Sequence, residues 1–279
     1  MFRPRARPRL FCDKIPFPEC IAQLADGSLL VTCGGKRYNE PGPILRVSAE
    51  GEVLGIFADR QCRFLGVVAL PGGDVIACDA TGGALVRFDA SGAVRGVVSA
   101  AGDWKLRKPN GAVHDGQGGV WITDSGTARA GEATGAVVHL SADGEATLAW
   151  DGLTFPNGVA MDPSGSWLYV AETRDDRLRR GAILGPGKLA APADFGGPLH
   201  SGPDGICADG DGNLYVAVTR SSSIVGVRGD GATVVLVKDD VLAMPAHALV
   251  QGDRSRILVA SLFADTIHTI DGAFVEAPE

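Results

Sequence analysis

The stretch Phe155-Pro156-Asn157-Gly158-Val159-Ala160 decides the fold, because close copies of it recur along the chain. Related segments are Pro109-Asn110-Gly111-Ala112 and Pro203-Asp204-Gly205-Ile206, and looser copies begin at Pro18, Phe64 and Pro245. Aligning the six copies on their second residue places them 42 to 47 residues apart. A period of this length is typical of the blades of a β-propeller.

Each repeat contains short apolar runs separated by turn residues such as Asp26-Gly27 and Pro163-Ser164-Gly165. The 39 glycines are about twice the usual share of roughly 7%, as expected where tight turns join many strands. No window carries sustained apolar spacing of three and four residues, which disfavours helices. The repeats therefore predict an all-β, six-bladed propeller with four antiparallel strands per blade.

We expect residues 1–279 to form a single propeller domain. The predicted blades begin near residues 18, 64, 109, 156, 203 and 245. A ring must also close, and the leading segment 1–15 offers an apolar run at Leu10-Phe11-Cys12. We expect this run to add an outer strand to the last blade.

Composition limits the partners. The net charge of -7 and the pI of about 5.3 argue against binding to nucleic acid. No run of about 18 apolar residues predicts a membrane span, and the basic run Arg3–Arg9 lacks the apolar stretch of a signal peptide. Six cysteines without a Cys-x-x-Cys pair predict free thiols and a cytoplasmic protein. Small molecules are the expected partners of a monomer or small homo-oligomer.

The repeat also predicts a functional site. The first strand of each propeller blade lines the central channel, so one repeat position supplies six side chains to one mouth of the channel: Glu19, Leu65, Asn110, Asn157, Asp204 and Ala246. Asn and Asp before Gly are common in turns, but Glu19 occupies the same position without such a motif. Four oxygen donors, two of them anionic, predict a divalent metal in the channel. Calcium is the preferred ion, with magnesium, manganese or zinc as alternatives.

These motifs resemble the regucalcin/gluconolactonase family, also called senescence marker protein 30, of six-bladed propellers. The resemblance implies that Glu19, Asn157 and Asp204 bind a catalytic divalent metal. It implies that Asn110 either joins the metal or contacts substrate, and that Asp204 is the general base. Many sugar lactonases of the family follow that Asn with Asp and place Arg two residues before it, whereas this chain has Gly111 and Lys108. The identity of the substrate is therefore left open.

The resemblance implies a metal-dependent hydrolase of a small lactone, whose carbonyl the metal would polarise. Two alternatives remain open at this point. One is a phosphotriesterase-like hydrolase that uses the same metal site. The other is a calcium-binding or ligand-binding propeller without catalysis, since fold does not fix function.

Further candidate site residues are expected near these six positions, which we call the ring positions. Substrate-binding candidates besides Asn110 are Lys108, His247 and Trp104. His200 is expected in an exposed loop, and His114 is expected to line the channel. We expect Asp124 and Glu172, at the ends of second strands, to cap turns or to support the metal ligands. The loop of residues 125–135 is rich in small residues and predicts either a lid or a solvated connection.

Overall fold

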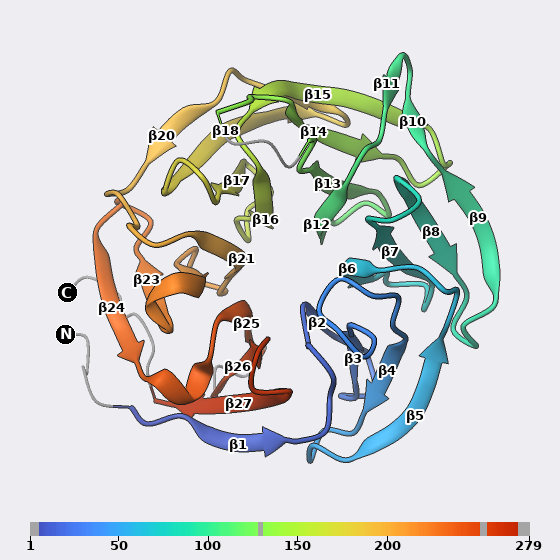
Figure 1. The fold of residues 1–279 in the computed structure, drawn as a ribbon. Helices are drawn as coiled ribbons and strands as arrows, with labels where there is room; N and C mark the ends of the chain where they lie inside the picture. Colours follow the sequence, from blue (N-terminus) through green and yellow to red (C-terminus); the bar gives the residue numbers. More distant parts are fainter. Residues whose placement is uncertain (1–5, 128–130, 252–255, 273–279) are drawn as a thin grey trace.

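The computed structural model describes residues 6–127, 131–251 and 256–272. Within these ranges the strands form six antiparallel blades around a central channel (Figure 1). The predicted six-bladed propeller is confirmed. The inner strand of each blade faces the channel, and later strands lie progressively farther out, as the rainbow colouring of Figure 1 shows.

The first three blades follow the chain from inside to outside. Blade 1 contains β2 (Ile21–Gln23), β3 (Leu29–Thr32), β4 (Ile44–Val47) and β5 (Val53–Ala58). Blade 2 contains β6 (Phe64–Ala69), β7 (Val75–Asp79), β8 (Ala84–Phe88) and β9 (Val94–Val98). A hairpin of β10 (Ala100–Ala101) and β11 (Trp104–Lys105) leads to blade 3, which contains β12 (Pro109–His114), β13 (Val120–Asp124), β14 (Gly135–Leu140) and β15 (Ala146–Leu153).

The remaining blades repeat the plan with additions at their edges. Blade 4 contains β16 (Pro156–Met161), β17 (Trp167–Glu172), β18 (Arg177–Gly185), β19 (Lys188–Leu189) and β20 (Ala193–Phe195). Blade 5 contains β21 (Pro203–Ala208), β22 (Leu214–Val218), the 3-10 turn η1 (Thr219–Ser221), β23 (Ser223–Val227) and β24 (Thr233–Lys238). After η2 (Asp240–Leu242), blade 6 contains β25 (Pro245–Val250), β26 (Arg256–Ser261), β27 (Thr266–Asp271) and β1 (Arg9–Cys12).

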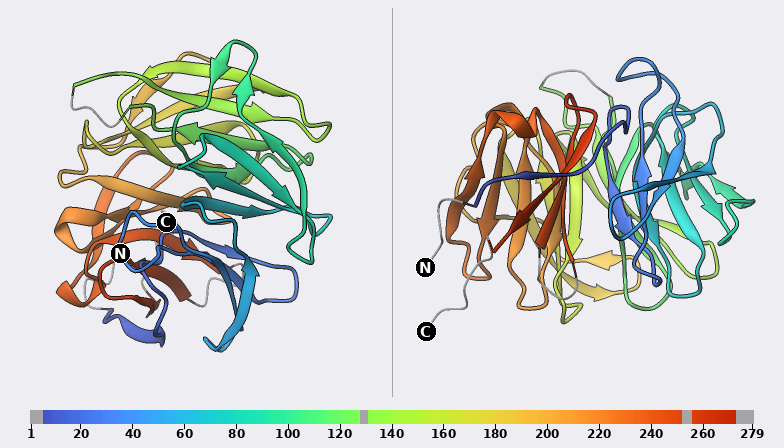
Figure 2. Two further views of the ribbon diagram at one scale, coloured as in Figure 1. Left: turned by 45° about the vertical axis from the view of Figure 1, so that its right-hand side comes forward. Right: turned by 90° about the horizontal axis from the view of Figure 1, so that it is seen from below.

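The strand β1 lies beside β27, so the start of the chain joins its last blade. Arg9 is paired with Thr269 and Leu10 with His268. Seen from the side in Figure 2, the blue leading strand lies against the red strands of the last blade. This pairing ties the two ends of the ring together and covers an edge that would otherwise expose backbone hydrogen-bonding groups.

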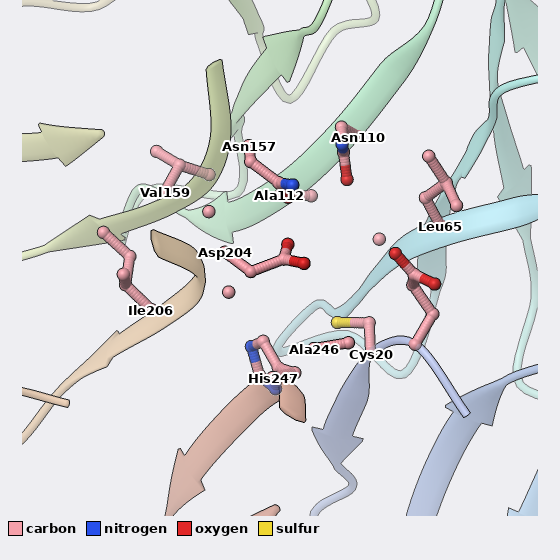
Figure 3. Close-up of a pocket in the computed structure, with 15 residues that line it drawn as sticks. Cys20, Leu65, Asn110, Ala112, Asn157, Val159, Asp204, Ile206, Ala246 and His247 are labelled. Carbon is pink, nitrogen blue, oxygen red and sulfur yellow. The ribbon is translucent and has the colours of Figure 1, made fainter. Parts of the chain in front are cut away.

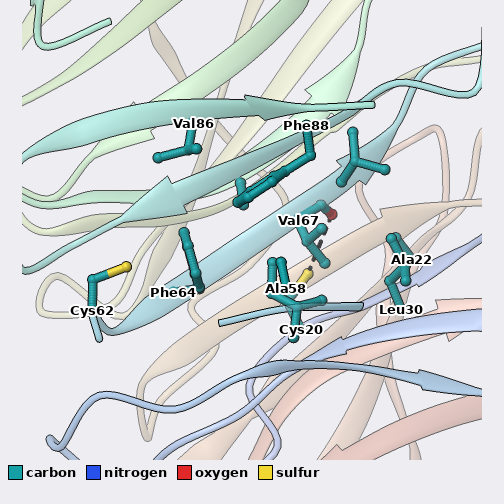
Figure 4. Packing of buried hydrophobic residues seen from close by; sticks show 12 residues of the cluster. Cys20, Ala22, Leu30, Ala58, Cys62, Phe64, Val67, Val86 and Phe88 are labelled. Atoms are coloured by element: carbon teal, nitrogen blue, oxygen red, sulfur yellow. Dashed lines mark hydrogen bonds between the residues drawn. The ribbon is translucent and has the colours of Figure 1, made fainter. Parts of the chain in front are cut away.

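The blades hold together through apolar side chains that fill the space between neighbouring sheets. In the space between blades 1 and 2, the buried Phe64 and Phe88 rings, both from blade 2, meet edge to face with centroids 5.9 Å apart and pack against residues of blade 1. Leu30 and Val67 belong to the same cluster (Figure 4). Burying aromatic and branched side chains in this way contributes roughly 1.5–3 kcal/mol for each residue. A blade therefore gains its stability from its neighbours, which fixes the inner strands around the channel.

The six cysteines are all free thiols in the structure, as predicted. Cys12, Cys20, Cys33, Cys62 and Cys78 are buried, and Cys207 is partly exposed. Burial raises the pKa of Cys20 and of Cys207 to about 12, so these thiols pack as small apolar side chains. No helix in the described part of the chain is long and apolar enough to cross a membrane.

Candidate metal and active site

The six ring positions identified from the repeat line one cavity at an end of the channel. Its wall includes all of them: Glu19, Leu65, Asn110, Asn157, Asp204 and Ala246. In Figure 3 the side chains of Asn110, Asn157 and Asp204 extend from different strands toward the middle of the channel. The cavity has a volume of about 20 Å³, which accommodates about one water-sized sphere. The repeat register thus brings four oxygen-bearing side chains to one small space.

The Asn-Gly and Asp-Gly pairs of the motif are not turns. They lie inside the extended strands β12, β16 and β21, and Gly111, Gly158 and Gly205 are absent from the positive-φ residues. In each of these strands the pairing register shifts across the motif. Such a bulge re-aims a side chain, and here it accompanies the residue that faces the channel.

The glycine of the motif is required by the close approach of the next blade. A Cβ atom on Gly111 would lie 2.5 Å from the carbonyl oxygen of Asn157, and one on Gly205 would lie 2.5 Å from that of Ala246. Any larger residue would push the inner strands apart. The small cavity therefore depends on glycine beside the ring position, because only glycine lets neighbouring inner strands converge so tightly.

Threonine hydroxyls on the second strands link neighbouring blades behind the ring. Thr32 Oγ1 accepts a hydrogen bond from the backbone N–H of Cys20 at 3.0 Å and donates to the carbonyl oxygen of Leu65 at 2.5 Å. Thr123 Oγ1 likewise accepts from the Gly111 N–H at 2.8 Å and donates to the carbonyl oxygen of Asn157. Each hydroxyl thus accepts a hydrogen bond from a backbone N–H of its own blade and donates one to the backbone carbonyl oxygen of the ring residue in the next blade.

Glu19 is buried immediately before β2, and its backbone N–H donates to the carbonyl oxygen of Thr32 at 2.9 Å. Its carboxylate pairs with Arg63, with Oε2 and Nη2 2.8 Å apart, and both side chains are almost fully buried. Burial raises the pKa of Glu19, while the positive charges of Arg63 and Lys108 oppose that shift. A buried carboxylate beside a single guanidinium retains lone pairs for a further cation.

Asp204 is the second residue of β21. Burial raises its pKa well above the usual range, and the negative charge of Glu19 raises it further. Lys108 and a hydrogen bond from the Asn157 side chain oppose this shift. Two carboxylates that repel each other around a shared cavity attract positive charge, because a cation stabilises both ionised forms at once.

Asn110 has its amide orientation set by a neighbour. Its Nδ2 donates to the Ser125 hydroxyl at 3.0 Å, and that hydroxyl donates to the carbonyl oxygen of Pro156 at 2.8 Å. In this orientation the amide nitrogen is engaged by Ser125, which leaves the carbonyl oxygen of Asn110 available to the channel. Two carboxylates and amide oxygens together form a hard, oxygen-only donor set, which fits a divalent cation such as calcium.

His247 also lines the cavity, next to the ring position of blade 6. Its Nδ1 atom is buried and has no hydrogen-bond partner within the described residues. Burial lowers the pKa of His247 to about 4, so its imidazole is neutral at neutral pH. Because the same residue lines the larger cavity farther along the channel, it lies at the junction between the two.

A group of aromatic and cationic side chains lies beside the carboxylates. Lys108 Nζ is 5.0 Å from the centroid of the Phe155 ring, and Arg174 Cζ is 4.7 Å from the same centroid. Arg63 Cζ is 5.5 Å from the centroid of Tyr38. The pKa of Tyr38 is raised first by the negative charge of Glu19 and then by burial, which places Tyr38 near the carboxylates.

Four of these residues were not anticipated from the sequence as members of the site: Arg63, Tyr38, Phe155 and Arg174. A signal for two of them exists in the repeat. These two are Arg63 and Phe155, which stand two residues before the ring position of their blades, as Lys108 does. Aligning this second position across the repeats would therefore have identified them. Tyr38 and Arg174 lie in connections outside the repeat motif and carry no such signal.

The other predicted residues lie away from the cavity wall. Trp104 donates from Nε1 to Asp124 Oδ2 at 3.0 Å, and it is absent from the residues that line the cavity. His114 accepts from the Gly116 N–H at 3.1 Å in the turn after β12. His200 is exposed and lines a separate surface groove.

Asp124 and Glu172 are fully buried at the ends of β13 and β17. Asp124 accepts backbone N–H groups of Arg107 at 3.1 Å and Lys108 at 2.7 Å. Glu172 accepts the Thr154 N–H at 2.6 Å. Both carboxylates therefore hold the segments that precede the inner strands of blades 3 and 4. Of the suggested lid, residues 128–130 lie outside the described residues.

Comparison with known proteins assigns the chain to a family. The family model described as SMP-30/Gluconolactonase/LRE-like region matches residues 42–261. The chain belongs to this SMP-30/gluconolactonase family. The resemblance drawn from the motifs is thereby confirmed, and the match covers the ring residues from Leu65 to Ala246.

The relatives of this SMP-30/gluconolactonase family member include lactonases. It is 33% identical over 129 residues to Lactonase drp35 of Staphylococcus saprophyticus, covering 44% of this chain and 39% of the relative. To Lactonase drp35 of Staphylococcus haemolyticus it is 34% identical over 113 residues, covering 38% of this chain and 34% of the relative. The matched part thus spans well under half the length of these curated relatives.

Solved structures share the fold of this family member over nearly its whole length. A gluconolactonase from Xanthomonas campestris superposes with a TM-score of 0.81 at 21% identity, covering 95% of this chain and 89% of that one. A calcium-binding protein, regucalcin, from Agrobacterium tumefaciens superposes with a TM-score of 0.72 at 16% identity, covering 96% and 94%. At these identities the likeness concerns the fold.

Proposed function

We propose that this protein is a divalent-cation-dependent hydrolase of a small lactone. The observation that carries the proposal is the convergence of Glu19 and Asp204, two buried carboxylates from blades 1 and 5, with Asn110 and Asn157 on one cavity. Membership of the SMP-30/gluconolactonase family and similarity to proteins named lactonases support the reaction class.

Glu19, Asn157 and Asp204 would hold the cation, with Asn110 either joining them or contacting the substrate. Calcium suits this hard donor set best, and magnesium, manganese and zinc are alternatives. When bound, the ion supplies Lewis acidity toward the lactone carbonyl and balances the two carboxylates.

Asp204 is assigned as the general base. Its carboxylate takes the proton of the attacking water, so that hydroxide adds to the carbonyl carbon. As the ring C–O bond breaks, Asp204 returns this proton to the leaving ring oxygen, which releases the hydroxy acid and restores the carboxylate. Burial raises the pKa of Asp204, which makes its carboxylate a stronger proton acceptor. Lys108 is assigned to the stabilisation of negative charge on the substrate, because its ammonium interacts electrostatically with the cavity carboxylates.

The proposal is tested by metal removal and reconstitution. The chain is treated with a chelator, loaded separately with calcium, magnesium, manganese or zinc, and assayed against five- and six-membered aldonolactones, aliphatic lactones and a phosphotriester. Lactone hydrolysis that disappears on chelation and returns with one ion supports the proposal. Asp204→Asn and Glu19→Gln should abolish it, whereas Asp230→Asn, in an exposed turn of blade 5, serves as the matched control and should not.

Three results would contradict it. Lactone turnover that survives chelation would remove the cation from the account. Tight calcium binding without hydrolysis of any lactone would favour a binding propeller, and hydrolysis of the phosphotriester alone would move the reaction to phosphorus.

A further inference from the structure

Outside the cavity wall, two cationic side chains share a single aromatic ring, and one of them, Lys108, interacts electrostatically with both Glu19 and Asp204. Lys108 comes from the start of blade 3, and Arg174 follows β17 in blade 4. The Lys108 ammonium lies 5.0 Å and the Arg174 guanidinium 4.7 Å from the centroid of Phe155. The faces of aromatic rings attract cations, so Phe155 can hold both groups in place. Burial lowers the pKa of Lys108, the negative charges of Glu19 and Asp204 oppose that shift, and the positive charges of Arg174 and Arg63 add to it.

The backbone of Phe155 adopts a conformation that most residues avoid. Its φ angle is 53°, in the left-handed region, which is unfavourable for a non-glycine residue and persists where the surroundings impose it. Three other blades have positive φ at the same repeat position, at Phe17, Gly202 and Met244. In blade 4 this backbone carries the ring on which the two cations rest.

With a divalent cation bound, positive charge would exceed negative charge around the cavity. Glu19 already pairs with Arg63 at 2.8 Å. Within the described ranges, no carboxylate lies at ion-pair distance from the Lys108 ammonium. If a divalent ion balances Glu19 and Asp204, the positive charge of Lys108 stays beside it, next to the Arg174 side chain on the same ring. Like charges held together in a partly buried space favour the binding of an anion.

We propose that the substrate is an anionic lactone, one that bears a carboxylate or phosphate group away from the reacting ester, and that Lys108 and Arg174 bind this group above Phe155. The inference rests on the proposed lactone hydrolysis and names the substrate class of that site. A guanidinium and an ammonium form short, charge-assisted hydrogen bonds to such oxyanions. The lactone ring then lies between the anion-binding pair and the carboxylates of the cavity.

The binding test uses unreactive probes and the full-length, calcium-loaded chain. Pyroglutamate is a five-membered lactam with a carboxylate, and 2-pyrrolidinone is the same ring without one. We expect calorimetry to show pyroglutamate binding about tenfold or more tightly than 2-pyrrolidinone, since a hydrogen bond to a charged group contributes about 1.5–3 kcal/mol. Lys108→Met and Arg174→Met should each remove most of this difference while calcium binding is retained.

The matched control is Arg107→Met. Arg107 adjoins Lys108 in sequence but lies over Trp104, 5.2 Å from one of its ring centroids, so the preference for pyroglutamate should persist in this variant. A turnover test complements binding: kcat/KM is compared for a neutral aldonolactone, an aldarolactone with a free carboxylate, and a 6-phosphorylated aldonolactone. The two charged substrates distinguish a carboxylate site from a phosphate site.

The outcomes separate this inference from the proposed function. Equal binding of the two probes to the wild-type chain, or an unchanged preference in both Lys108→Met and Arg174→Met, would overturn the anion site even if neutral lactones are hydrolysed. A preference for pyroglutamate that depends on Lys108 and Arg174 would support the anion site even if no lactone were hydrolysed, a result that would count only against the proposed function.

Discussion

The two ends of the channel are built from the same inner strands, yet they differ in character. At one end, Glu19, Asn110, Asn157 and Asp204 surround a cavity of about 20 Å³. Farther along, a wider cavity of about 250 Å³ is lined chiefly by apolar side chains such as Val68, Val113, Ala160, Met161 and Leu249. The change occurs within three or four residues along each strand.

The polar end differs from the apolar end in the backbone of its inner strands. At the polar end, the inner strands of blades 2 to 5 each have a shift in pairing register, and in each of them a glycine follows the ring residue. Past the shift, the strands pair regularly and the channel is apolar. The bulge and the glycine thus let neighbouring inner strands converge at this end. The residue at the ring position then decides whether an oxygen donor faces the cavity, because blade 2 has both features but carries Leu65.

The largest effect is expected from removing the base at the polar end. Asp204→Asn keeps the size of the side chain but removes its negative charge, so kcat/KM for the best lactone should fall on the order of a thousandfold. Met161→Leu, a volume-conserving change in the apolar cavity, should leave kcat/KM near the wild-type value. Equal losses in both variants would show that the two ends do not differ in function.

The second expected effect concerns the glycine of the motif. In Gly158→Ala the new Cβ would lie 2.6 Å from the Ile206 nitrogen and nearer still to the Asp204 carbonyl oxygen. Separating the inner strands of blades 4 and 5 should lower the free energy of unfolding by about 2–3 kcal/mol, measured by urea denaturation. Gly96→Ala is the control, because Gly96 lies in outer strand β9, has no positive φ and has open space around its Cβ. A stable Gly158→Ala protein would contradict the packing argument.

The third effect is a pH dependence at the junction of the two cavities. His247 has a pKa of about 4 in the folded protein, below the value of about 6.5 in an unfolded chain. The unfolded state therefore binds a proton first as the pH falls from about 6.5 to 4, and the folded state loses up to about 3 kcal/mol of stability across that window.

His247→Gln should accordingly lose less stability than the wild type between pH 6.5 and 4, measured as the free energy of unfolding at each pH. His200→Gln, which removes an exposed imidazole, is the control for the loss of a histidine. Parallel curves for the wild type and His247→Gln would show that the imidazole is not held neutral by burial.

The smallest effect is expected behind the ring. Thr123→Val preserves shape but removes the hydroxyl that links the Gly111 N–H to the carbonyl oxygen of Asn157. The unfolding free energy should fall by about 1–2 kcal/mol, because both buried backbone groups lose a partner. The control is Thr233→Val at an exposed position of β24, which should hardly change the unfolding free energy. Equal losses of unfolding free energy in both variants would show that Thr123 does not bridge the two blades.

The sequence predicted the architecture and the ring well because both follow from one repeat. A fixed register places the same strand position of every blade at the same depth, so Glu19 and Asp204 could be assigned to one cavity although they are distant in the chain. Sequence alone does not distinguish a turn at Asn110-Gly111 from a strand in which Gly111 meets the next blade.

The rim of the site was harder to predict, since it is built by connections. Tyr38 reaches the site from the segment between β3 and β4, and Arg174 from the segment after β17. Trp104 was a reasonable candidate for a pocket wall, yet the β10–β11 hairpin directs its indole N–H to Asp124. Such placements depend on loop geometry and on pairwise hydrogen bonds, which the period of the repeat does not determine.

The central claim is that the ring at the polar end binds one divalent cation. Calorimetric titration of the chelator-treated chain with calcium tests it most directly, in the wild type, Asp204→Asn and Glu19→Gln, with Met161→Leu as the control. We expect one ion per chain in the wild type and control, and an affinity at least about a hundredfold weaker in each carboxylate variant. Calcium binding of unchanged stoichiometry and affinity in Asp204→Asn and Glu19→Gln would contradict it.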